Sequence, residues 1–159
     1  MEKIIIAAVS KNRVIGRNGI IPWHIKEELK HFKNTTTGFP VLMGRTTWES
    51  LNKPLENRIN IILTTNPDFS FSHPNVVICN SIFDALSWCE ENNYSKVFII
   101  GGEQVFEDTL KVADRMIISE LKFDVEGDRF FPQIDLNEWE LVSSSDKSEF
   151  VIKEYLRRK

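Results

Sequence analysis

Glu28 is the residue in this chain whose position most directly suggests chemistry. A helical stripe of apolar residues is predicted after Pro22-Trp23, with members spaced i, i+4 and i+7: Ile25, Leu29 and Phe32. On that helix Glu28 lies about 60° from the centre of the stripe, whereas Glu27 faces solvent. Because burial disfavours the charged form of a carboxyl, Glu28 is suited to offer a proton or to bind a flat, nitrogen-rich ligand. The alternative is a helix-flank glutamate that reaches water or pairs with Lys30.

Two junctions between a predicted strand and a predicted helix carry glycine, at 43–47 and 100–104. Free N–H groups at such a junction attract phosphate, and glycine lets the backbone approach closely. Side chains that add donors are Arg45, Thr46 and Thr47, with Thr64 and Thr65 at the end of a third strand. Glycine there is usually only a turn former, and the chain has neither G-x-G-x-x-G nor a Walker lysine. Two such junctions with an arginine would nevertheless suit a phosphorylated dinucleotide.

Apolar segments that alternate with helical patterns predict an α/β fold with a mostly parallel sheet. Strands are expected at 3–9, 41–43, 59–63, 76–78, 96–100 and 116–119, and helices after Trp23, from Gly44, after the cap residue Ser81, and over 103–111. The last two apolar segments, 139–143 and 150–156, have no helix between them and predict an antiparallel pair at the sheet edge. The long loop 10–23 is typical of a functional flap.

Composition limits the classes of partner. The 159 residues predict one domain, 1–159, with 42% hydrophobic and 27% charged residues. A net charge of −3 argues against binding to nucleic acid or to an anionic membrane. No apolar run has membrane-spanning length, and the N-terminal one is too short for a signal peptide. Cys79, Cys89 and the three histidines lack metal-ligand spacing, so we expect a cytoplasmic protein without metal or disulfide.

In order and spacing, several segments of the chain resemble the dihydrofolate reductase family. The matching segments are Ile6-Ala7-Ala8, Val14-Ile15-Gly16, Pro22-Trp23 with Glu28 and Phe32, 43–50, 58–63, Ile100-Gly101-Gly102, and Glu126-Gly127-Asp128 before Phe131-Pro132. The resemblance implies a single-domain, mostly parallel eight-stranded sheet with an antiparallel edge and four flanking helices. It also implies a monomer that reduces 7,8-dihydrofolate to 5,6,7,8-tetrahydrofolate with NADPH, for one-carbon metabolism.

The same resemblance implies the site residues. Glu28 would bind the pterin, with Ser119 and Trp23 beside it. The substrate pocket would be lined by Ile6, Ala8, Phe32, Leu51, Leu55 and Arg58, the last binding the glutamate carboxylate of the substrate. The NADPH site would comprise Ala8, Ile15, Gly16, Gly19, Ile20, Ile21, Gly44, Arg45, Thr46, Thr47, Leu63, Thr64, Thr65, Ile100, Gly101, Gly102, Glu103, Gln104, Val105 and Phe106. Residues 15–21 would belong to the flap, supported by Asp128, and the Gly101–Gly102 peptide would be cis.

The chain departs from the family pattern at four positions. Lys26 stands where proline is frequent, Glu103 replaces a third glycine, Gln104 stands where some relatives have arginine, and Phe106 replaces tyrosine. These changes leave Glu28 and Arg58 in place; Lys26 leaves the helix start less rigid, and the other three bear on the pyrophosphate and nicotinamide contacts.

Two other functions fit parts of the pattern. One is a reductase of the same fold that acts on a pyrimidine intermediate of riboflavin synthesis; Glu28, Arg58 and the compact length argue against it. The other is a non-catalytic sensor of NADPH or folate, which the intact acid and both phosphate junctions argue against. For the reductase we hypothesise that Glu28 polarises the substrate or relays a proton and does not protonate it directly.

Overall fold

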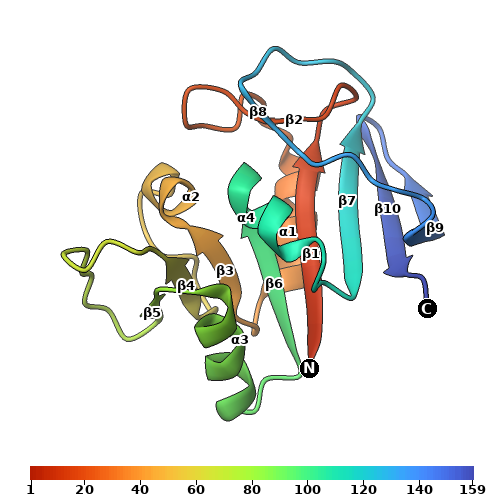
Figure 1. Cartoon of the computed structure of the whole chain (residues 1–159). Coiled ribbons are helices and arrows are strands. Elements are labelled where there is room, and N and C mark those ends of the chain that lie inside the picture. Colours follow the sequence, from red (N-terminus) through yellow and green to blue (C-terminus); the bar gives the residue numbers. More distant parts are fainter.

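Eight strands form one sheet in the computed structural model, which describes residues 1–159 (Figure 1). Their spatial order is β5-β4-β3-β6-β1-β7-β10-β9. Their bounds are β1 Glu2–Val9, β3 Val41–Gly44, β4 Asn60–Leu63, β5 Val76–Cys79, β6 Lys96–Gly101, β7 Arg115–Leu121, β9 Trp139–Asp146 and β10 Phe150–Arg157. The six strands from β5 to β7 pair in parallel, and β10 is antiparallel to both β7 and β9. The predicted parallel sheet with an antiparallel edge is confirmed.

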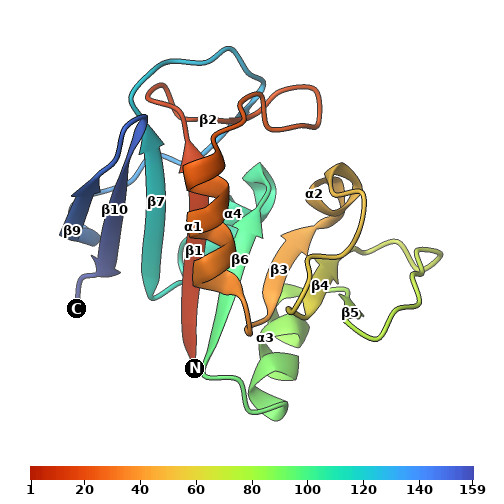
Figure 2. The ribbon, with the colours of Figure 1, turned by 180° about the vertical axis from the view of Figure 1, so that it is seen from behind.

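Four helices cover the two faces of this sheet. Their bounds are α1 Lys26–Thr36, α2 Arg45–Ser50, α3 Ile82–Glu91 and α4 Glu103–Thr109. Alternate residues of β1 point to opposite faces: Ile5 packs in one cluster with side chains of α3 and α4, whereas Ile4 and Ile6 pack in another with those of α1 and α2. Seen from behind, α1 crosses the sheet over β1 (Figure 2). Burial on both faces explains the near-continuous apolar sequences of the central strands.

The buried face of α1 differs from the predicted stripe. Leu29 is 46% exposed, whereas Glu28 is only 7% exposed and lies on the buried face together with Thr36. The reason is that the helix begins at Lys26, and Ile25 precedes it in an extended conformation. Ile25 therefore does not share the helical phase from which the stripe was counted. The start of α3 does follow the sequence signal, because the Ser81 hydroxyl accepts a hydrogen bond from the Asp84 N–H at 3.0 Å.

The flap segment contains a small second sheet that the sequence pattern did not predict. Strand β2, Val14–Gly16, pairs antiparallel with β8, Arg129–Phe130. Strands of three and two residues are too short to show an alternating pattern, so their pairing depends on contacts distant in sequence. The pairing fixes the first part of the flap against the segment that follows β7.

Candidate active site

Many of the predicted site residues lie at the carboxyl ends of four neighbouring strands, β3, β6, β1 and β7, whereas Arg58 precedes the amino end of β4. Met43 pairs with Gly101 across β3 and β6, and Ala8 pairs with Ser119 across β1 and β7. Since parallel strands end at a common edge, both glycine junctions and the residues around Glu28 are brought to one side of the sheet.

Glu28 is a buried carboxyl without a cationic partner. It projects from the first turn of α1, and neither Lys30 nor any other basic side chain forms an ion pair with it. Burial raises its pKa above the usual carboxyl value, and the buried Ser119 hydroxyl beside it partly offsets this increase. The expectation of a desolvated acid is confirmed, and the alternative of a solvated or Lys30-paired glutamate is wrong.

An apolar wall lies on the face of the sheet that α1 covers. It contains four of the predicted substrate-pocket residues, Ile6, Phe32, Leu51 and Leu55, in one packed cluster with Trp48 and with Ile100, which was predicted for the NADPH site. Ala8 is half-buried near the end of β1. Trp23 packs in a smaller neighbouring cluster with Ile25, Leu121 and Phe150. The structure therefore gathers the predicted apolar residues, with Trp23 at their margin.

Arg58 is also buried and unpaired, with 7% of its surface exposed and no carboxylate within ion-pair distance. Its Nε donates to the Glu56 carbonyl at 2.8 Å, and its Nη1 donates to the Thr36 hydroxyl at 3.0 Å. Burial lowers its pKa, and the charge of Glu56 opposes that shift. The Asn60 side chain donates to the Arg58 carbonyl at 3.1 Å and fixes the backbone beneath it. These contacts orient the guanidinium, whose planar fork of donors suits a carboxylate.

The two glycine junctions pack against each other. A Cβ atom at Gly44 would lie 3.1 Å from Val105, and one at Gly101 would lie 3.5 Å from the Thr47 hydroxyl. The backbone of Gly101 has φ +128°, which disfavours other residues, and the Gly101–Gly102 peptide is cis as predicted. Where the ends of β3 and β6 meet there is therefore backbone with little side chain, half-buried at Gly44 and Gly102 and buried at Gly101.

Arg45, at the first position of α2, is exposed but held in place. Its Nε contacts Oε1 of Glu49 at 2.7 Å, and its guanidinium lies 5.0 Å from the ring centre of Phe69. Thr64 and Thr65 line a hollow of about 700 Å³ beside it, which Phe69 also lines. The other residues around this hollow come from the loop after β4, from β5 and from α3: Asn66, Pro67, Val77, Ile78, Cys79, Asn80, Phe83, Asp84, Ser87, Trp88 and Glu91.

Three predicted cofactor residues have side chains engaged elsewhere. Oε1 of Glu103 accepts a hydrogen bond from the Phe130 N–H at 2.7 Å, and Nε2 of Gln104 donates to Asp108 at 2.9 Å. Phe106 is buried with its ring centre 5.0 Å from that of Phe131. Glu103 and Phe106 thus connect α4 to the segment after β7, whereas the Gln104 hydrogen bond lies within α4.

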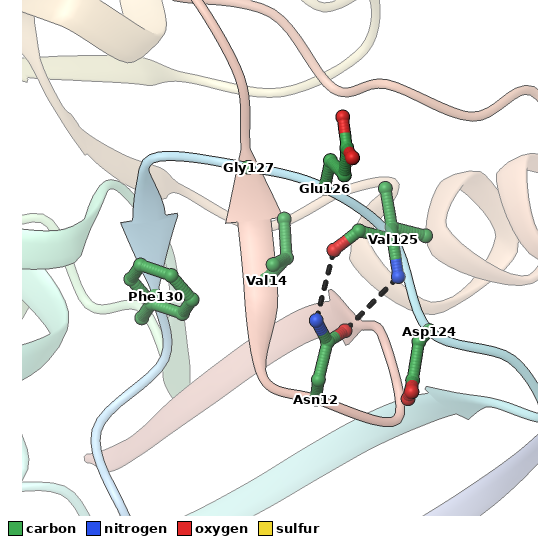
Figure 3. A pocket seen from close by; sticks show the side chains of 7 residues that line it. All are labelled: Asn12, Val14, Asp124, Val125, Glu126, Gly127 and Phe130. Carbon is green, nitrogen blue, oxygen red and sulfur yellow. Dashed lines mark hydrogen bonds between the residues drawn. The ribbon is translucent and has the colours of Figure 1, made fainter.

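The flap is joined to the segment after β7 by several hydrogen bonds (Figure 3). The Asn12 side chain donates to the Val125 carbonyl at 2.9 Å and accepts from the Val125 N–H at 3.0 Å. The Asp128 N–H donates to the Gly16 carbonyl at 3.0 Å, as expected for a supporting residue. A Cβ at Gly127 would lie 2.2 Å from Val14, so this contact requires glycine. The hollow in Figure 3, about 520 Å³, lies here and not at Glu28.

The far part of the flap is solvent-exposed. Ile20 and Ile21 have 61% and 58% of their surfaces exposed, and Gly19 adopts φ +81° next to them. Ile15 is half-buried against the core. The predicted flap residues thus divide into an anchored part and an exposed part.

Sequence reasoning missed the residues that hold the predicted ones in place. Thr36 orients Arg58, Glu49 and Phe69 contact Arg45, and Asn12 joins the flap to Val125. Of these, only the Arg45/Glu49 pair carries a local signal, the i, i+4 spacing on a helix. The others depend on contacts between segments far apart in the chain.

Comparisons with known proteins agree with the geometry. The sequence model of the family described as dihydrofolate reductase matches residues 3–155. The chain is 41% identical to dihydrofolate reductase of Bacillus subtilis, over 87% of this chain and 80% of that protein. It is 37% identical to dihydrofolate reductase HdrB of Haloferax volcanii, over 98% and 83%. A solved structure of dihydrofolate reductase from Enterococcus faecalis, complexed with NADP(H) and RAB-propyl, superposes with TM-score 0.88 at 32% identity, covering 99% of this chain and 97% of that one.

A separate observation concerns membranes. No helix of the structure combines the length and the apolar character that crossing a bilayer requires.

Proposed function

The chain belongs to the dihydrofolate reductase family and reduces 7,8-dihydrofolate to tetrahydrofolate with NADPH, and from this premise we propose how its own residues perform the reaction. The observation that carries the proposal is the pair of buried, unpaired charges, Glu28 and Arg58. Burial of a charge without a partner costs free energy. A ligand that offers a complementary group to each of these two side chains relieves that cost when it binds.

The residues at the strand ends fit NADPH. Packed glycines at 44 and 101 leave backbone that a ligand can approach, and Arg45 with Thr46, Thr64 and Thr65 offers donors suited to phosphate. We propose that Thr47 and the backbone of 101–106 hold the pyrophosphate and nicotinamide side, because the side chains of Glu103 and Gln104 are engaged elsewhere. When bound, NADPH supplies the hydride that reduces the pterin.

On the substrate side, Glu28 accepts hydrogen bonds from the amino group and ring nitrogen of the pterin. The apolar wall of Ile6, Phe32, Leu51 and Leu55 packs against the rings, and Arg58 binds the glutamate carboxylate at the far end. Thr36 holds Nη1 of Arg58, and the guanidinium is thereby oriented before the substrate arrives. Such pre-organisation lowers the entropic cost of binding and aligns the reacting atoms.

Glu28 also has a role in proton transfer. Because its pKa is raised, the carboxyl holds a proton at a higher pH than an exposed glutamate does. We propose that it polarises the ring or relays this proton toward the imine nitrogen and that Ser119 orients it. Closure of the flap around Ile20 and Ile21 would exclude water during the transfer.

We further propose that residues 1–159 act as one domain, as a cytoplasmic monomer, and without nucleic-acid partners. In support of the single domain, the main sheet runs from β1 at the N-terminus to β10 near the C-terminus. The net charge of −3 supports the absence of a nucleic-acid surface.

One assay tests the proposed function. Loss of NADPH absorbance is followed with and without dihydrofolate, with the riboflavin pyrimidine intermediate as a second substrate. We expect dihydrofolate-dependent oxidation and none with the pyrimidine. Binding of NADPH or folate without turnover would instead support a sensor.

A further inference from the structure

The guanidinium of Arg45 is fixed by two side chains that come from different segments. Glu49 lies one turn later on α2 and contacts Nε at 2.7 Å, and Phe69 lies in the loop between β4 and β5 and covers the guanidinium at 5.0 Å. The Arg45 and Glu49 side chains are 43% and 58% exposed, a situation in which an arginine usually has considerable rotamer freedom. The contacts with Glu49 and Phe69 restrict the rotamers of Arg45.

We infer that Glu49 and Phe69 are positioning residues that make the Arg45 region selective for a phosphorylated adenine nucleotide over its unphosphorylated counterpart. The inference rests on the proposed function, in which Arg45 binds the adenosine phosphate end of NADPH. Glu49 occupies the Nε side and Phe69 covers a face, so the terminal Nη1 and Nη2 edge is left to bind an anion through two parallel hydrogen bonds.

Phe69 also connects this arginine to the neighbouring hollow. Its ring lines the hollow together with Thr64 and Thr65 while it stacks on Arg45. Further along the same loop, Phe71 packs edge-on against Trp48 of α2, with ring centres 5.0 Å apart. The loop is therefore anchored on α2 independently of Phe69, and the contact of Phe69 with Arg45 can be removed without freeing the loop.

The negative charge of Glu49 has an effect on phosphate binding that opposes its orienting effect, and the experiment must distinguish the two effects. A carboxylate beside Arg45 repels a phosphate through space, whereas its hydrogen bond orients the guanidinium. Because both side chains are partly exposed, solvent weakens the repulsion, and orientation is the larger effect. Glutamine keeps an acceptor without charge, and alanine removes both.

The experiment measures dissociation constants of NADP+ and NAD+ by calorimetry, without substrate, so the readout does not depend on turnover. These two ligands differ only by the phosphate on the adenosine ribose. We expect F69L to weaken NADP+ binding about two- to tenfold and NAD+ binding much less. The ratio of the NAD+ dissociation constant to the NADP+ dissociation constant measures the preference for the phosphate. We expect E49A to lower this ratio, as F69L does, and E49Q to restore its wild-type value. D146N is the matched control, because it breaks a comparable ion pair, between Asp146 of β9 and Lys122, at the opposite edge of the sheet from the Phe69 loop.

The outcomes are distinct. If F69L weakens NADP+ and NAD+ equally, or if E49A leaves the ratio unchanged or raises it, the positioning role is wrong. R45Q tests the underlying assignment separately. If R45Q leaves the ratio unchanged, the phosphate contact of the proposed function fails as well; if R45Q lowers the ratio and F69L and E49A do not, only the positioning role of Glu49 and Phe69 is overturned.

Discussion

The two sides of the proposed site use charge in opposite ways. On the substrate side, defined by Glu28, Ser119 and Arg58, both ionisable groups are buried and neither has an ionic partner. On the cofactor side, defined by Arg45, Glu49, Phe69 and Thr64, the arginine is exposed, paired and stacked. The first side carries an electrostatic cost that a ligand relieves, and the second stays close to electrostatic balance without one.

This difference predicts different sensitivities to mutation. Interactions of a buried charge are weakly screened, so its removal changes binding or rate strongly. An exposed pair is screened by water, and its loss changes binding by a smaller factor. The substrate side should therefore respond to single substitutions by orders of magnitude, and the cofactor side by small multiples.

Substitution of Glu28 by glutamine should produce the largest effect. The variant keeps the shape but can neither hold nor relay a proton, so we expect kcat to fall by about 10²–10³-fold while NADPH affinity changes little. In the wild type, the rate should decline as pH rises above the raised pKa of Glu28, since the protonated form is then lost. Steady-state rates from acid to neutral pH measure this, with the exposed neighbour Glu27→Gln as the control. An identical pH profile in Glu28→Gln would refute the proton role.

Replacement of Arg58 by leucine should act on substrate affinity. Charge-assisted hydrogen bonds contribute about 1.5–3 kcal/mol, so we expect the KM for dihydrofolate to rise about 10- to 100-fold with a smaller change in kcat. A dihydropterin without the glutamate tail provides the control, because wild type and variant should reduce it equally well. Equal losses for both substrates would mean that Arg58 supports the fold and does not bind the tail.

On the cofactor side, Arg45→Gln should have a moderate effect. We expect the KM for NADPH to rise about three- to tenfold, because a partly exposed phosphate contact is screened by solvent. The KM for NADH should stay close to the wild-type value, since NADH lacks the ribose phosphate. A loss as large as that of Arg58→Leu would remove the contrast between the two sides.

The dependence of stability on pH offers a smaller and independent test. The folded-state pKa of Glu28 is raised, so the folded state binds the proton more tightly and stability declines as pH rises from about 4.5 through the folded pKa. Glu28→Gln should therefore have a higher urea midpoint than wild type at pH 7, and the difference should vanish at pH 4. Glu27→Gln should show no such gain. An unchanged midpoint at pH 7 would mean that Glu28 carries no desolvation cost.

His31, one turn after Glu28, should give the opposite slope. Burial lowers its pKa, with Lys147 adding to this shift and Glu154 opposing it, and its Nε2 has no hydrogen-bond partner. Stability is then lost as pH falls from about 6.5 toward the folded pKa, because the unfolded chain binds the proton more readily. His31→Asn should flatten the slope of the urea midpoint between pH 5 and pH 7. A slope equal to that of wild type would exclude His31 as its origin.

The same contrast explains how much the sequence could predict. Glu28 and the parallel sheet follow from local patterns, namely helical phase and continuous apolar strands, and both are confirmed. Helical phase still misplaced Leu29, because Ile25 lies outside the helix and the count began one residue too early. The burial of Arg58 had no local signal, since Thr36 reaches its guanidinium from α1.

On the cofactor side, the hydrogen-bond donors could be predicted from the sequence, but the residues that position those donors could not. Glycine and arginine at the end of a strand are visible in the sequence, whereas the stacking of Phe69 on Arg45 joins residues 24 positions apart in the chain. The β2/β8 pair was missed for the same physical reason, because its stability comes from contacts between distant segments and not from strand propensity.

Thr64→Val should have the smallest effect and marks the lower limit of the comparison. The Thr64 hydroxyl accepts a hydrogen bond from the Asn66 N–H at 3.1 Å, so it already supports the turn after β4. Valine keeps the shape and loses this acceptor, and a net hydrogen bond of about 0.5–1 kcal/mol corresponds to a two- to fivefold change at most. We expect the KM for NADPH to rise less than threefold and the KM for dihydrofolate to stay constant. A tenfold rise would show that Thr64 binds the cofactor as strongly as Arg45 does, and the cofactor side would then depend on one hydroxyl as heavily as on its arginine.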